Sequence, residues 1–232
     1  MNTLQEVIFM DKISKHYGHD DNRVIAVDHV ELKIHRGEFT ALVGPSGSGK
    51  TTLLNIMSGL DTPSTGTTYL AGQSISTMKG NQLSDYRRDH IGFIFQSYNL
   101  IPVLTAYENV EYILLLQKIP LKERRDRVYA ILKEVGLEGR ENRRPTELSG
   151  GQQQRVAVAR AIASKPDIIL ADEPTANLDS HTGSALLDMM KELNEKEKIT
   201  FVFSTHDQMI MDRAKRLIIL KDGKVHRDEV RA

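Results

Sequence analysis

Residues 39–51 read Phe-Thr-Ala-Leu-Val-Gly-Pro-Ser-Gly-Ser-Gly-Lys-Thr, an apolar run followed by the motif G-x-x-x-x-G-K-[ST]. The apolar part predicts a strand, and residues 49–59 predict the helix that follows it. Between a strand and a helix, the backbone N–H groups of such a turn wrap the phosphates of a nucleotide, while the lysine reaches the β and γ oxygens. The predicted nucleotide-binding residues are Gly44, Pro45, Ser46, Gly47, Ser48, Gly49, Lys50, Thr51 and Thr52.

The charge of the expected ligand predicts a metal ion as well. ATP brings about four negative charges, whereas a helix N-terminus offers roughly half a positive charge and Lys50 offers one. A divalent cation is therefore required, and Mg²⁺ fits with the Thr51 hydroxyl as a ligand. We expect ATP and Mg²⁺ as the cofactors.

A second apolar run, Ile168–Ala171, ends in the two carboxylates Asp172 and Glu173. We expect Asp172 to face the metal ion through a water molecule and Glu173 to polarise an attacking water. The alternative is a strand that simply ends in a solvated acidic turn. The phosphate-binding motif in the same chain favours the functional interpretation, because doubly wound sheets bind ligands at this edge.

Another glycine-rich turn, Leu148-Ser149-Gly150-Gly151-Gln152, lies at a predicted helix start far along the chain from Lys50. A helix start of this kind can also face an anion. One nucleotide does not obviously need two such turns on one chain. The surplus indicates a machine in which two chains work as a pair.

The alternation of strands and helices predicts an α/β fold with a mostly parallel sheet. Several predicted strands are continuously apolar, as expected for strands that are buried on both faces. Residues 100–147 break the alternation with successive helical patterns. We therefore expect one domain, 1–232, with a core of about 1–96 and 166–232 and an inserted helical lobe of about 97–165. Hairpin turns are predicted at Gly18–Asn22 and Asp222–Lys224. The predicted strands cover residues 6–10, 25–34, 39–43, 91–95, 168–171, 199–204 and 217–220.

Composition excludes several classes of protein. Acidic and basic residues number 31 each, so no overall charge argues for a nucleic-acid partner. The absence of cysteine excludes disulfides, cysteine nucleophiles and thiolate metal sites. The first residues lack the pattern of a secretory signal, and no apolar run approaches the ~18–20 residues of a membrane span. We expect a cytosolic domain that serves a membrane only through another chain.

Three motifs occur in order: LSGGQ followed by QQRVAVARA, and then ILADEPTANLD. Together they resemble the signature, the acidic strand and the D-loop of the ATP-binding cassette (ABC) family. That resemblance implies a P-loop NTPase core, an antiparallel β subdomain and an inserted helical subdomain. In the family, two ATPase domains meet head to tail, and each ATP lies between the P-loop of one and the signature turn of the other. ATP contacts from a second copy are therefore implied for Ser149, Gly150, Gly151 and Gln152.

The resemblance also implies roles for individual residues. Tyr17 matches the aromatic residue that stacks on adenine, although a plain strand-edge tyrosine is the alternative. Gln96 matches the Q-loop glutamine, which touches Mg²⁺ and the attacking water, and His206 matches the histidine that contacts the γ-phosphate. Asp179 matches the D-loop, which communicates across the dimer. The implied catalytic residues are Glu173, His206, Lys50 and Gln96, and the implied metal-binding residues are Thr51, Gln96 and Asp172.

Residues 95–109 and 143–155 are similar to a narrower group, the ATPases that pair with macrolide-exporter and lipoprotein-releasing permeases. Such permeases have few membrane spans and a large extracytoplasmic domain. The implied function is an ATPase that dimerises on ATP, on the inner face of the cell membrane, and drives such a permease. A mechanical or regulatory ATPase that acts on a membrane partner without transport stays open as the alternative. Chromosome-maintenance relatives carry long coiled coils or zinc inserts between the P-loop and the signature. They are disfavoured, because the spacing between Lys50 and Leu148 is too short for the former and the absence of cysteine argues against the latter.

Overall fold

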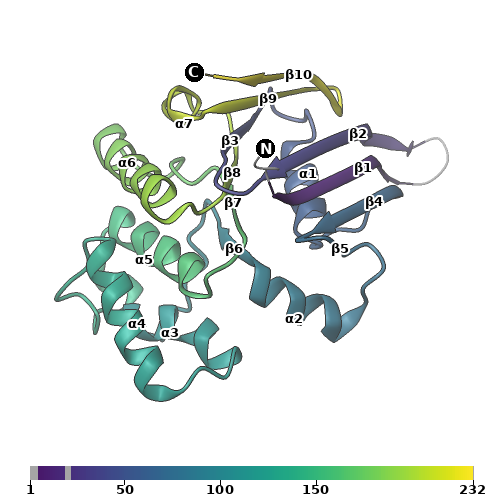
Figure 1. Cartoon of the computed structure of the whole chain (residues 1–232). Helices are drawn as coiled ribbons and strands as arrows, with labels where there is room; N and C mark the ends of the chain where they lie inside the picture. The colour runs from purple at the N-terminus through teal and green to yellow at the C-terminus, as the bar shows by residue number, and fades with distance from the viewer. Residues whose placement is uncertain (1–4, 19–21, 232) are drawn as a thin grey trace.

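A computed structural model describes residues 5–18 and 22–231, which form two sheets surrounded by helices (Figure 1). The larger sheet has six strands in the order β10-β9-β3-β8-β7-β6, and all of its neighbours are parallel except the β9–β10 pair. The predicted α/β fold is therefore confirmed. The strands of this sheet are β3 (Phe39–Val43), β6 (Ile91–Ile94), β7 (Ile168–Asp172), β8 (Phe201–Thr205), β9 (Arg216–Lys221) and β10 (Lys224–Val230).

The centre of this sheet is buried on both faces. All five residues of β3 and of β8 are buried, which explains why the sequence there is continuously apolar rather than alternating. Side chains of β3 alternate between two hydrophobic cores. Phe39, Ala41 and Val43 join the core on the side of the helical lobe, whereas Leu42 joins the core under the smaller sheet.

The smaller sheet is antiparallel, with the strand order β2-β1-β4-β5. Its strands are β1 (Glu6–Tyr17), β2 (Val24–His35), β4 (Thr65–Leu70) and β5 (Gln73–Ser74). Tyr17 lies opposite Val24, and the predicted turn between them includes residues 19–21, which lie outside the described part of the chain. The other predicted hairpin turn is confirmed, because residues 222–223 join the antiparallel strands β9 and β10.

Helix α1 (Lys50–Met57) follows β3, and α2 (Gly80–His90) precedes β6. Between β6 and β7 lie α3 (Ala106–Leu116), α4 (Leu121–Glu134), the 3₁₀ turn η2 (Pro145–Glu147) and α5 (Gly150–Ala163), within the stretch that the sequence assigns to the helical lobe. Figure 1 shows α3, α4 and α5 on the opposite side of the central sheet from the antiparallel sheet. Helices α6 (Ser180–Glu197) and α7 (Gln208–Arg213) complete the fold.

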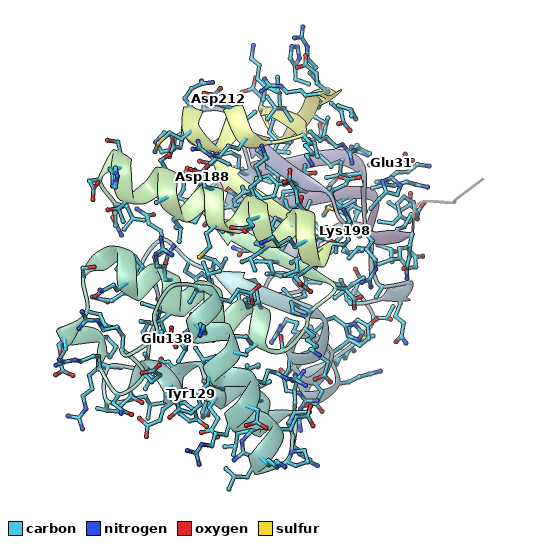
Figure 2. The ribbon with its side chains drawn as sticks, turned by 60° about the vertical axis from the view of Figure 1, so that its left-hand side comes forward. Glu31, Tyr129, Glu138, Asp188, Lys198 and Asp212 are labelled. Carbon is cyan, nitrogen blue, oxygen red and sulfur yellow. The ribbon has the colours of Figure 1, made fainter. Side chains whose placement is uncertain are left out.

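Charged side chains lie on the outer surface, as Figure 2 shows for Asp188 on α6, Asp212 on α7 and Glu138 in the loop after α4. Within residues 5–18 and 22–231, no helix is both long enough and apolar enough to cross a bilayer.

Candidate active site

The turn after β3 needs glycine for two separate reasons. Gly49 has a φ of 100°, in the region that L-residues avoid, and a Cβ there would lie 2.4 Å from the carbonyl oxygen of Ala26. Gly47 has a φ of 78°, but a Cβ there would meet no atom within 4 Å. The backbone at Gly47 is therefore open to a ligand, whereas Gly49 is closely packed.

The C-terminal hairpin supports this turn from behind. The backbone N–H of Gly223, between β9 and β10, donates to the carbonyl oxygen of Ser48 at 3.2 Å. The carbonyl oxygen of Gly223 in turn accepts from the N–H of Asp28 at 2.9 Å. The turn is thus held between β2 and the hairpin.

Several hydrogen-bond donors converge at the start of α1, which has no side-chain cap. Lys50 is 8% exposed, and its Nζ donates to the carbonyl oxygens of Gly44 and Pro45 at 2.7 and 3.0 Å. The buried hydroxyl of Ser48 has no hydrogen-bond partner among the described residues. The phosphates of a nucleotide can be bound here by three kinds of donor: the ammonium group of Lys50, the unpartnered hydroxyl of Ser48 and the free N–H groups at the start of α1.

These groups open onto a cavity of about 770 Å³, within the size range of small-molecule sites. The cavity brings residues 45–52 of the predicted nucleotide-binding turn together with Gln96, Glu173 and His206, whereas the predicted residues Gly44 and Asp172 lie outside its lining. Val24 and Ile25, which were not predicted as site residues, form part of its wall. Their position in the sequence, as two apolar residues just after the turn that follows Tyr17, could have indicated this role. The full lining comprises Val24, Ile25, Ala26, residues 45–52, Gln96, Glu173, Ala176 and His206.

Thr51 and Asp172 lie together, as a shared metal ion requires. Both carboxylate oxygens of Asp172 are 3.5 Å from Thr51 Oγ1. Burial raises the pKa of Asp172, and the neighbouring charge of Glu173 raises it further. A hard cation bound by these oxygens would offset both effects, so the residues fit Mg²⁺.

Glu173 is held in a strained backbone conformation, with a φ of 44°. Its Oε1 lies 2.6 Å from Nδ1 of His206, and its Oε2 accepts from the Thr205 hydroxyl at 3.0 Å. The pairing of β7 with β8 creates these contacts, since Asp172 lies opposite Ser204. The side chain of Glu173 is 17% exposed, whereas that of His206 is 76% exposed. The carboxylate is therefore oriented by neighbours and still reaches the cavity, as a general base must.

The signature turn does not line this cavity. Ser149 is the N-cap of α5: its Oγ accepts from the N–H of Gln152 at 3.3 Å, and its own N–H donates to Gln152 Oε1 at 3.0 Å. Gly151 is required by packing, because a Cβ there would lie 2.3 Å from the Thr182 methyl carbon. Ser149, Gly150, Gly151 and Gln152 thus form an ordered turn outside the wall of the P-loop cavity.

Tyr17 also lies outside the cavity lining, although it lies beside it. Its hydroxyl donates to Asp61 Oδ2 at 2.6 Å, and Lys15 Nζ sits 4.9 Å from the ring centre. Burial and Asp61 raise the pKa of Tyr17, and the Thr52 hydroxyl opposes that shift, so the ring is next to a residue of the lining. Tyr17 is 43% exposed, which leaves its ring accessible for stacking.

A family model described as ABC transporter matches residues 27–176. The chain belongs to the ABC transporter family. This ABC ATPase is 48% identical over 211 residues to the uncharacterized ABC transporter ATP-binding protein MJ1508 of Methanocaldococcus jannaschii, covering 91% of this chain and 94% of that protein. It is 45% identical over 225 residues to the macrolide export ATP-binding/permease protein MacB of Escherichia coli, covering 97% of this chain but 35% of MacB.

Structural comparison agrees with the sequence comparisons. A dimeric structure of a post-hydrolysis state of the ATP-binding cassette MJ0796, bound to ADP and Pi, superposes on the ABC ATPase with a TM-score of 0.87 and 44% identity. The match covers 96% of this chain and 98% of that chain. MJ0796 is likewise a protein of Methanocaldococcus jannaschii. The chain is therefore a nucleotide-binding ATPase with the ABC fold.

Replacing Asp172 with Asn is expected to raise the melting temperature of this ABC ATPase at neutral pH, without nucleotide or metal. The pKa of Asp172 is raised from its ordinary value of 3.8, so the folded protein holds this proton more tightly than the unfolded chain does. Its contribution to stability is complete below that ordinary value and is lost as the pH rises through the folded pKa. Above that pKa, the ionised carboxylate destabilises the fold.

Thermal unfolding followed by circular dichroism at several pH values measures this effect. The gap between Asp172→Asn and the parent protein should widen as the pH rises, whereas the exposed control Asp126→Asn should show no such trend. A lower melting temperature for Asp172→Asn at neutral pH would contradict the expectation. Mg²⁺ with ATP should stabilise the parent protein more than the variant.

Proposed function

We propose that this ATPase dimerises on ATP and thereby drives a separate permease of the macrolide-exporter or lipoprotein-release type. The observation that carries the proposal is that the two glycine-rich turns of one chain do not share a cavity. The P-loop opens onto the cavity with Glu173 and His206, whereas the signature turn lies outside it. A second copy, placed head to tail, supplies its own signature turn to that cavity. The dimeric structure of MJ0796 supports, by similarity, an assembly of two copies.

Hydrolysis then uses the groups that line the cavity. Glu173 orients a water and accepts its proton as the water oxygen bonds to the γ-phosphorus and the bond to the ADP oxygen breaks. Lys50 and His206 stabilise the negative charge that develops on the γ-phosphate. When bound, Mg²⁺ would neutralise phosphate charge from a position held by Thr51, Asp172 and Gln96. Loss of phosphate removes the contacts that favour the dimer, which then opens.

Exposed apolar residues on the helical lobe support a membrane-protein partner. Five of them lie in the segment after Gln96 and on α3, close in sequence to the glutamine in the cavity wall, and two more, Leu121 and Tyr129, lie on α4. Single exposed apolar residues are common, but several in one part of a small lobe favour a contact surface. The lobe surface consists of Ile101, Val103, Tyr112, Leu115 and Leu116.

The double variant Val103→Asp with Leu115→Asp is expected to weaken binding to the permease by about tenfold or more, because each new carboxylate would lose water in an apolar contact. Basal ATP hydrolysis should stay near the parent value, since neither residue lines the cavity. Co-purification with the co-expressed permease, together with phosphate release from the isolated ATPase, measures the two effects. Val230→Asp is the matched control, because Val230 is 82% exposed but lies on β10.

Reconstitution of the complex in proteoliposomes tests the proposal as a whole. ATP-dependent movement of substrate across the bilayer, lost with Glu173→Gln, is the expected result. ATP hydrolysis that the permease stimulates without any transport would replace the proposal with a mechanical or regulatory role. Unchanged permease binding by the double variant would move the docking surface elsewhere.

A further inference from the structure

The segment that carries Gln96 is held by side chains from two other parts of the chain. The carbonyl oxygen of Phe95 accepts from Gln154 Nε2 on α5 at 3.4 Å. That of Gln96 accepts from Asn177 Nδ2, in the loop before α6, at 2.9 Å. Gln154 is fully buried, and the same Nε2 also donates to the carbonyl oxygen of Pro174, next to Glu173, at 2.7 Å.

Arg160, further along α5, holds the next two carbonyl groups. Its Nη2 donates to the carbonyl oxygen of Tyr98 at 2.9 Å, and its Nη1 donates to that of Asn99. One planar guanidinium thus spans two successive peptide groups, a geometry that the single ammonium of lysine does not reproduce.

The turn that Arg160 holds is strained. Tyr98 and Asn99 have φ values of 60° and 49°, so two successive residues other than glycine lie in the left-handed region. Asparagine tolerates that region better than tyrosine, and two such residues in succession are unfavourable unless their surroundings hold them. The hydroxyl of Tyr98 contributes only a long contact, 3.5 Å from the carbonyl oxygen of Asn177.

Arg160 is itself an unusual side chain. It is partly buried, and within the described residues no carboxylate lies within ion-pair distance of it, so desolvation lowers its pKa. A buried charge without a counter-charge is unfavourable for folding unless hydrogen bonds satisfy it. Here the hydrogen bonds go to the strained turn, so the partly desolvated charge and the strained backbone stabilise each other.

We propose that Arg160 is a positioning residue for Gln96. It fixes the turn at 98–99, and thereby the backbone that places Gln96 in the wall of the nucleotide cavity. Because Arg160 and Ser149 belong to the same helix, a displacement of the signature turn is transmitted to Gln96 through α5. The inference rests on the role proposed for Gln96 and adds the residue that orients it.

Arg160→Lys tests this inference against a matched variant of the same helix. Arg155 also donates from a guanidinium to a backbone carbonyl, that of Val135 at 2.8 Å, but it faces the helical lobe instead of the 95–99 segment. Since the chain has no cysteine, Ser97→Cys accepts a single nitroxide label beside Gln96. Electron paramagnetic resonance then reports the motion of this segment in the nucleotide-free protein, whether or not the enzyme hydrolyses ATP.

The label is expected to become several-fold more mobile with Arg160→Lys and to keep its parent mobility with Arg155→Lys. Without the label, Arg160→Lys should lower kcat by about tenfold and raise the half-saturating Mg²⁺ concentration, with KM for ATP within about twofold because the P-loop still binds the phosphates. Equal label mobility in both variants, or an unchanged kcat, would overturn the inference. Should Arg160→Lys fail to fold, Arg160→Gln keeps a neutral donor on α5 and is judged by the same criteria.

The label experiment separates this inference from the proposed function. Glu173→Gln and transport assays test the ATPase and its coupling, and their failure would leave the label mobility unaffected. Conversely, a label that keeps its parent mobility with Arg160→Lys would refute the positioning role of Arg160 and leave the hydrolysis mechanism as it stands.

Discussion

Replacing Glu173 with Gln is expected to lower the rate of ATP hydrolysis by about 10²–10⁴-fold, the usual contribution of a general base. The amide cannot accept the proton of the attacking water. Binding of ATP should persist, because the P-loop, Lys50 and Thr51 are untouched. The variant should therefore accumulate as an ATP-bound dimer. Phosphate release and light scattering in the presence of Mg²⁺ and ATP measure the two effects.

Glu134→Gln is the control for this prediction, since it makes the same chemical change at an exposed position of α4 outside the cavity lining. Its turnover should match that of the parent protein. Near-normal hydrolysis by Glu173→Gln would show that another group activates the water. The geometry then offers His206, 2.6 Å from the same carboxylate, as the next residue to replace.

Ser149→Arg is expected to abolish ATP-induced dimers while leaving ATP binding to the monomer intact. In the proposed dimer, Ser149 faces the γ-phosphate on the other copy, and an arginine is too large for that contact. Because each site would need both copies, hydrolysis should fall together with dimerisation. Light scattering in the Glu173→Gln background, where dimers accumulate, gives the clearest measurement, and a fluorescent nucleotide reports binding.

Loss of an N-cap also destabilises a helix by about 1 kcal/mol, so the prediction needs a control with the same defect. Thr105 provides it, because Thr105 and Glu108 form a capping box at the start of α3 just as Ser149 and Gln152 do for α5. Thr105→Arg should lose a similar amount of stability and still dimerise on ATP. Normal hydrolysis by a monomeric Ser149→Arg protein would refute the shared site.

The central sheet could be predicted from sequence because its strands are short, apolar and continuous. The strand and helix around the P-loop follow from residues 39–57 alone. Strand β4 was not predicted, since Thr65–Leu70 has few apolar residues and depends on pairing with β1. Helix α2 was also missed: it has no buried residue, and long-range contacts such as the hydrogen bond from the Tyr86 hydroxyl to the carbonyl oxygen of Leu70 hold it in place.

The functional site, too, has parts that local sequence predicts and parts that depend on long-range contacts. The sequence motifs predicted that the P-loop, Gln96, Glu173 and His206 act on the same nucleotide. Residues 45–51 of the P-loop do line one cavity together with the other three residues. The hydrogen bonds that hold these residues in place could not be predicted, because they join parts of the chain that are distant in sequence. The guanidinium of Arg160 at the 98–99 turn is one example.

The hairpin behind the P-loop has a consequence for how the protein is made on the ribosome. Strand β3 leads into the P-loop, yet its two neighbours in the sheet, β8 and β9, belong to the last third of the sequence. The turn that supports Ser48 is translated later still, at Gly223. Most of the nucleotide site is therefore synthesised before its central strand has a neighbour. Such non-local pairing folds slowly, so a nascent chain exposes an apolar strand until β8 and β9 have been translated, and it depends on protection from aggregation until then.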